Sequence, residues 1–160
     1  VEDAFFDLVS EQIIDSGDVE TIDAASYAGQ RGIRVDGYGG DPLLFQNTLT
    51  LFVADFHQSP EVATLSGKEM LGDFKRLQND LERALESTWR NGLEESDPAF
   101  GLADLIATRW NDIAKIRLIL ITNKISNAHI SQLTEPILLL IPIKGRRPRR
   151  PNITSKAKIK

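Results

Sequence analysis

The sequence contains no cysteine and only two histidines, His57 and His129. Without thiolates the chain can build neither a disulfide framework nor a zinc or iron–sulfur site that depends on cysteine. Two histidines leave very little scope for a multi-histidine metal centre. Any metal ion would therefore be held mainly by carboxylates, which are ligands that Mg²⁺ prefers. A metal site in this chain would therefore be expected at a pair of acidic residues.

Long apolar runs are also missing. The longest, Pro136–Ile143, contains two prolines and is far shorter than the roughly 20 residues of a membrane-spanning helix. The chain begins Val1-Glu-Asp-Ala, which is acidic where a secretory or transit peptide would be basic. We therefore expect a cytoplasmic protein without a membrane partner.

The two ends of the chain differ in charge. The formal net charge is -4, yet residues 141–160 contain eight basic residues and no acidic one, whereas residues 1–140 contain 11 basic and 23 acidic residues. With 41% hydrophobic and 26% charged residues, the composition is typical of one soluble globular domain. We predict a folded domain over residues 1–143, followed by a basic, disordered tail over residues 144–160.

Hydrophobic periodicity predicts a mixed α/β fold. Apolar residues at helical spacing, with a capping box at Ser66 and Glu69 and a proline start at Pro98, predict helices over 4–14, 66–91 and 99–110. Alternating or β-branched runs predict strands over 33–38, 48–56, 113–122 and 136–143, and a weaker one over 19–27. Residues 126–133 fit either a short helix or a loop. This order is typical of an antiparallel meander followed by a helical crossover into a central strand.

Two neighbouring predicted strands carry the residues that could support chemistry. Asp36 lies in the first strand, and Asp55 and His57 end the second, where alternation places them on the face of Val53. Two carboxylates that converge at a sheet end could hold Mg²⁺, which can activate a water molecule against a phosphodiester. Glu11 from the first helix would add a third acid. On residue types alone, the favoured alternative is that Asp36 caps a turn, Asp55 faces water and His57 lies in a loop.

Several segments resemble a known family. Ile33-Arg-Val-Asp-Gly-Tyr38, Leu49-Thr-Leu-Phe-Val-Ala-Asp-Phe56 and the opening Asp3-Ala-Phe-Phe-Asp-Leu8 are similar to the N-terminal domain of abortive infection phage resistance proteins. The order of strands, helices and acids also resembles the PD-(D/E)xK nuclease-like fold. The resemblance covers roughly residues 3–123. It implies an α/β domain with a restriction-endonuclease-like mixed sheet in αβββαβ order, flanked by helices, and a role in bacterial phage defence.

The third strand departs from the nuclease pattern. That pattern places an acid or glutamine two residues before a lysine, whereas here Val53 takes the acid's position and Asp55 the lysine's. The lysine positions water and stabilises developing negative charge, which an aspartate cannot do. In a frame shifted by two residues, Asp55 would be the metal ligand and His57, a base near neutral pH, would replace the lysine.

Two functions remain open. In the first, Asp36 and Asp55 hold Mg²⁺, His57 and Glu11 complete the catalytic set, and the domain is a metal-dependent nuclease acting on nucleic-acid phosphodiesters. In the second, the motif is degenerate, and the domain is a non-catalytic module that binds nucleic acid or a phage or protein partner. That module would serve a C-terminal region missing from this chain, or act as a homo-oligomer. The first hypothesis requires the two aspartates to converge at one end of the sheet.

The basic tail has three interpretations. It could be a nucleic-acid arm, because clustered Arg and Lys neutralise phosphates regardless of base sequence. It could be an unstructured terminus without a role, as charged, proline-rich ends commonly are. It could also be foreign to the domain, because the family resemblance fades after Asn123. Composition favours the second and third interpretations over the first.

Overall fold

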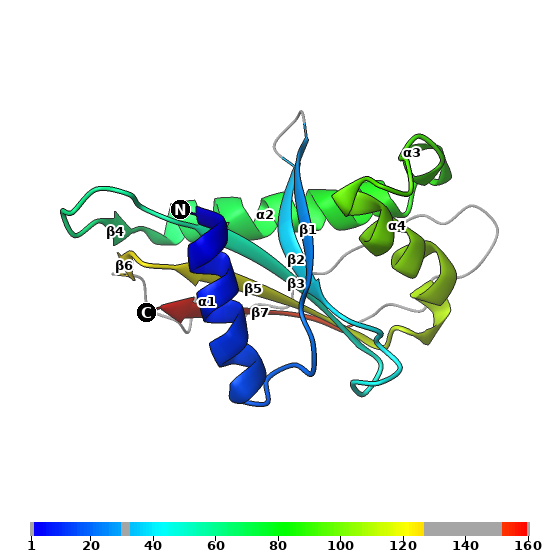
Figure 1. Cartoon of the computed structure of the whole chain (residues 1–160), viewed down its shortest axis with the longest axis horizontal. Helices are drawn as coiled ribbons and strands as arrows, with labels where there is room; N and C mark the ends of the chain where they lie inside the picture. Colours follow the sequence, from blue (N-terminus) through cyan, green and yellow to red (C-terminus); the bar gives the residue numbers. More distant parts are fainter. Residues whose placement is uncertain (1, 30–32, 127–151, 160) are drawn as a thin grey trace.

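The computed structural model describes residues 2–29, 33–126 and 152–159 (Figure 1). Its main sheet has five strands in the order β1-β2-β3-β5-β7. These strands are β1 (Asp23–Gly29), β2 (Ile33–Gly39), β3 (Thr48–Asp55), β5 (Lys115–Thr122) and β7 (Asn152–Ile159). β1, β2 and β3 form an antiparallel meander, whereas β3, β5 and β7 run parallel. The prediction of an α/β fold with a mixed sheet is confirmed.

β3 and β5 form the apolar centre of the sheet. They pair over eight consecutive residues, from Thr48 opposite Lys115 to Asp55 opposite Thr122. Every residue of β3 except Asp55 is buried, as expected for a strand covered on both faces. A second, two-stranded parallel sheet of β4 (Thr64–Leu65) and β6 (Ile125–Ser126) lies beyond the ends of these strands.

Helices cover both faces of the main sheet. α1 (Glu2–Asp15) packs on one face, where Phe6 and Ile13 join Phe52 and Ile119 in a common apolar layer. α2 (Gly67–Ala84) and α4 (Pro98–Arg109) pack on the other face, and Figure 1 shows α1 and α2 on opposite sides. The close approach of α1 requires a glycine in β2, because a Cβ atom on Gly37 would lie 2.6 Å from the Phe6 ring. No helix among the described residues is long and apolar enough to cross a membrane.

The helix predicted over 66–91 is divided into two. The capping box at its start is present, since the Ser66 hydroxyl accepts the Glu69 N–H and the Glu69 carboxylate accepts the Ser66 N–H. However, α2 ends at Ala84, and a separate short helix, α3, covers Ser87–Asn91. Between Leu85 and Trp89 the sequence has three polar residues. They provide no apolar face that could continue the packing of the helix against the sheet. α4 begins as predicted, with Asp97 accepting the Ala99 N–H, and a 3-10 turn, η1 (Trp110–Asp112), follows it.

The basic tail contains a strand. Residues 152–159 form β7, which pairs in parallel with β5 along its whole length, so the expectation of a disordered tail was wrong for this segment. That expectation relied on charge and proline content, whereas Ile153, Thr154 and Ile159 are β-branched residues that favour strands. The rest of the tail, the segment 126–133 beyond Ser126, and the strand expected over 136–143 lie outside the described residues.

Candidate functional site

A group of charged side chains gathers at the end of the sheet where β3 and β5 end. Val53 belongs to the apolar layer beneath α2, and alternation places Asp55 on the same face. Asp55 lies opposite Thr122 in the parallel register, and Lys124 follows two residues later. We call this group the carboxyl-end cluster; its members are Glu2, Arg34, Asp36, Asp55, Asp73 and Lys124.

Asp55 is held by an ion pair and by its backbone. The Lys124 ammonium (Nζ) donates to the Asp55 carboxylate (Oδ2) at 2.7 Å, and the two side chains are only 17% and 22% exposed. The Thr122 hydroxyl donates to the Asp55 carbonyl at 2.8 Å. A charge-assisted hydrogen bond shielded from water is stronger than a surface ion pair. Asp55 is therefore neutralised by a cation of the chain itself.

Asp36 completes the pairing of β2 with β3. The backbone ladder between these strands runs from Gly39 to Gly37, and just beyond it the Asp36 carboxylate (Oδ2) accepts the Ala54 N–H at 2.7 Å. The same oxygen accepts Nε of Arg34 at 3.1 Å, and the Arg34 guanidinium also pairs with Glu2 of α1. The carboxylate thus takes the place of a backbone acceptor and carries its own counter-charge.

Asp73 of α2 connects the two pairs. It is 6% exposed and accepts a hydrogen bond from Arg76 at 3.0 Å. Burial, and then the negative charge of Asp55, raise the pKa of Asp73 to about 6, whereas the cations of Arg76, Lys124 and Arg34 act in the opposite direction. The Asp36 carboxylate accepts the N–H of Ala54, the residue before Asp55, so the Asp55 and Asp36 ion pairs lie at the same end of the sheet.

The structure brings some of the predicted site residues together and separates others. Asp36 and Asp55 both belong to the carboxyl-end cluster. His57 lies beside it, half-buried, with its backbone held by Asn123, whose side chain accepts the His57 N–H at 2.8 Å and donates to its carbonyl at 2.9 Å. Glu11 is exposed on α1. It lies nine residues, or about 13 Å along the helix, from Glu2, which is the acid of α1 that reaches the cluster.

Four members of the cluster were missed from sequence: Glu2, Arg34, Asp73 and Lys124. The sequence did contain a signal for Asp73. It falls on the apolar face of α2 with Phe74 and Leu77, where an acidic residue is uncommon. A signal for Lys124 would have come from assuming a parallel pairing of β3 with β5, which brings residues 122–124 beside 55–57. Arg34 precedes Asp36 by two residues on the same strand, and this spacing suits an ion pair.

The carboxyl-end cluster, as arranged, does not fit Mg²⁺. This ion requires a near-octahedral shell of oxygen atoms, but the bonded Asp36 oxygen already has two donors and Asp55 is paired with Lys124. The position that an acid occupies in the nuclease pattern is taken by Val53, which is buried and apolar. Within the described residues, no group of three or more histidine or acidic side chains could hold a metal ion. The assignment of Asp36 and Asp55 as metal ligands stays a prediction that requires cations to move.

The fold and its charged sheet end define an α/β domain whose order of elements is compatible with the nuclease-like order expected from sequence. A family model described as the abortive infection phage resistance protein N-terminal domain matches residues 5–141. The chain therefore belongs to this family, which assigns it to phage resistance. No curated protein and no solved structure matches the chain.

Proposed function

We propose that this domain is a non-catalytic binding module of a phage-resistance protein, in which ion pairs replace the metal site of a nuclease-like sheet. The observation that carries the proposal is the Lys124–Asp55 pair, at 2.7 Å and largely shielded from water. A divalent ion bound by Asp55 would face the ammonium of Lys124 at close range, and like charges in a partly buried site repel strongly.

The second carboxylate supports the same conclusion. Asp36 serves the fold by accepting the Ala54 N–H at the end of the β2–β3 ladder, and Arg34 neutralises it. Val53, which is 1% exposed, contributes no oxygen where the nuclease pattern has an acid or glutamine. Both aspartates therefore have structural partners, and the third ligand position is apolar.

The charge of the domain favours a protein over a nucleic acid as its partner. Residues 1–140, which include every described element except β7, contain 23 acidic and 11 basic residues, and the whole chain with its basic end keeps a formal net charge of -4. An excess of negative charge repels phosphate backbones. A partner with a basic surface would be attracted by the same field. We infer that the module binds a basic protein surface.

A second candidate is the metal-dependent nuclease in which Asp36 and Asp55 bind Mg²⁺. One observation favours it. Lys124 contacts Asp55 and could take the role of the lysine that β3 lacks, and the Asp73 carboxylate is near enough to Asp55 to interact with it electrostatically. In this case Arg34 and Lys124 would have to move away from the aspartates when the ion binds.

Metal binding and cleavage separate the two candidates. Wild type, Asp55→Asn, Lys124→Met and the control Asp7→Asn, which changes an exposed carboxylate of α1, are titrated with Mg²⁺ and Mn²⁺ in a thermal unfolding assay. The same proteins are incubated with labelled single-stranded DNA, double-stranded DNA and RNA. We expect that neither metal ion raises the Tm of the wild type by binding at Asp55, so wild type and Asp55→Asn should respond to metal in the same way. We also expect no cleavage above background. Metal-dependent cleavage lost in Asp55→Asn but retained in Asp7→Asn would overturn the proposal.

A further inference from the structure

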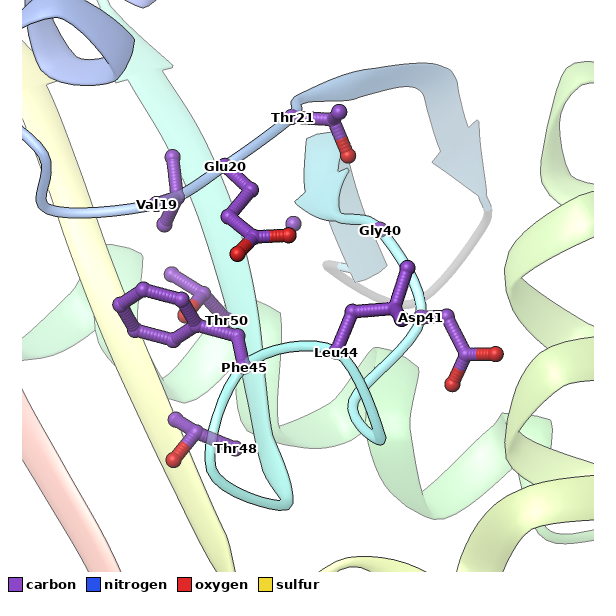
Figure 2. Close-up of a pocket in the computed structure, with 10 residues that line it drawn as sticks. Val19, Glu20, Thr21, Gly40, Asp41, Leu44, Phe45, Thr48 and Thr50 are labelled. Carbon is purple, nitrogen blue, oxygen red and sulfur yellow. The ribbon is translucent and has the colours of Figure 1, made fainter.

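A small hollow opens at the other end of the main sheet (Figure 2). It is lined by residues 19–21, by the turn at 39–41, by residues 44–45, and by Thr48 and Thr50 of β3. Thr50 and Asp55 are five residues apart on β3, or about 17 Å at the usual rise of a strand. The hollow is therefore separate from the carboxyl-end cluster.

The wall of the hollow includes a glycine, Gly40, that packs closely against Thr21. Gly40 has a φ of +26°, and a Cβ atom at this position would lie 2.3 Å from the Thr21 hydroxyl. A larger residue would push against Thr21 and alter the wall of the hollow. The part of the wall that Gly40 and Thr21 form together therefore depends on this glycine.

The hollow combines apolar walls with one free carboxylate. Leu44, which is 70% exposed, and Phe45 line it from the turn before β3, and Figure 2 shows the Glu20 carboxylate extending toward this turn. Among the residues that the structure describes, no basic side chain forms an ion pair with Glu20. Glu20 is the carboxylate that an incoming cation would meet.

The other charged groups nearby are already engaged. Asp41 points away from Glu20 in Figure 2, accepts the Leu43 N–H at 2.9 Å and lies 3.8 Å from Arg109. Arg117 donates to the Asp18 carbonyl and to the Thr50 hydroxyl, and its guanidinium lies 5.6 Å from the centre of the Phe45 ring. Asp41 and Arg117 are therefore held by other partners, and Glu20 is left as the carboxylate that can bind a cation. The apolar side chains beside it suit a cation carried on an aliphatic chain.

We propose that this hollow binds a lysine or arginine side chain of a partner protein. The ammonium or guanidinium pairs with the Glu20 carboxylate, and the aliphatic stem packs against Leu44 and Phe45, as long basic side chains commonly do. Leu43, the residue before Leu44, is 44% exposed and adds apolar surface to the same turn. This favours a polypeptide over a free amine, which would have no further groups to place there.

The inference gives the proposed binding module a site and a partner chemistry, and in that sense it rests on the proposed function. It does not depend on metal binding at the carboxyl-end cluster, because the two sites occupy opposite ends of β3. A failure of the titration below would remove this hollow as a binding site and leave the metal and cleavage assay unaffected.

The test is an NMR titration of the ¹⁵N-labelled full chain with three probes. They are the peptide acetyl-Gly-Lys-Gly-amide, the same peptide with norleucine in place of lysine, and 1,5-diaminopentane. We expect the lysine peptide to shift the amide signals of Thr21, Gly40 and Leu44. Its affinity should fall at least about fivefold in Glu20→Gln, and the control Glu61→Gln, which removes an exposed carboxylate elsewhere, should bind as the wild type does.

A second variant tests the apolar wall. Leu44→Ser alters an exposed side chain, so the fold should persist, and we expect it to weaken binding of the lysine peptide. The proposal is overturned if the norleucine peptide binds equally well, if Glu61→Gln weakens binding as much as Glu20→Gln, or if the shifts lie elsewhere. Binding of 1,5-diaminopentane as tightly as the peptide would overturn the choice of a polypeptide ligand.

Discussion

Asp80 of α2 should make this domain less stable as the pH rises. Its side chain is fully buried, and neither carboxylate oxygen has a hydrogen-bond partner among the described residues. Burial raises the pKa of Asp80 from 3.8 to about 7. Between these two values the folded state retains a proton that the unfolded state has released, so the free energy of unfolding falls as pH rises. The loss amounts to on the order of 4 kcal/mol by pH 7.

The substitution Asp80→Asn isolates this effect, because the amide has nearly the same shape and does not titrate. The free energy of unfolding is measured by urea denaturation at intervals from pH 4 to pH 8, for wild type, Asp80→Asn and the control Glu82→Gln, an exposed position on the same helix. The stability of Asp80→Asn relative to wild type should rise across this range by on the order of 4 kcal/mol. A difference that does not change with pH would show that Asp80 ionises as an exposed carboxyl does, and would refute the reasoning.

Two further substitutions test the packing and the cluster. Lys124→Met leaves Asp55 without its cation, so the free energy of unfolding should fall by about 2 kcal/mol in urea denaturation, whereas Arg83→Met, which removes an exposed ion pair, should change it by less than about 0.5 kcal/mol. Equal effects would contradict the shielding of the Lys124–Asp55 pair. Gly37→Ala places a Cβ atom against the Phe6 ring and should cost about 1–3 kcal/mol, part of which Phe6→Leu in the same chain should restore; unchanged stability would contradict the close packing of α1.

Most elements of the fold were predictable because their signals are local. The ends of α1, β2, β3, α4 and β5 lie within two residues of the predicted ends. The end of α2 was not predictable in this way, because it depends on where the helix loses its apolar contact with the sheet. β7 was missed because its partner is β5, a strand distant in sequence, and charge dominates the composition of the segment around it.

The candidate site was predictable only in part. Alternation and the meander located Asp36 and Asp55, because both depend on strand geometry alone. The rotation of α1 could not be read from sequence, so Glu11 was chosen where Glu2 makes the contact with Arg34. Lys124 depends on the register of β5 against β3, which is fixed by the packing of the whole crossover. The missing information was how separate elements fit together.

The parallel pairing of β3 with β5 also has a consequence for synthesis of the chain. Paired residues of the two strands, such as Asp55 and Thr122, are 67 positions apart. At translation rates of about 5–20 residues per second, roughly 3–13 s separate the emergence of one strand from that of the other. During that interval the β1–β2–β3 meander has one open edge of apolar residues, which can pair with another nascent chain. Slower elongation through residues 56–122 should therefore increase co-translational aggregation.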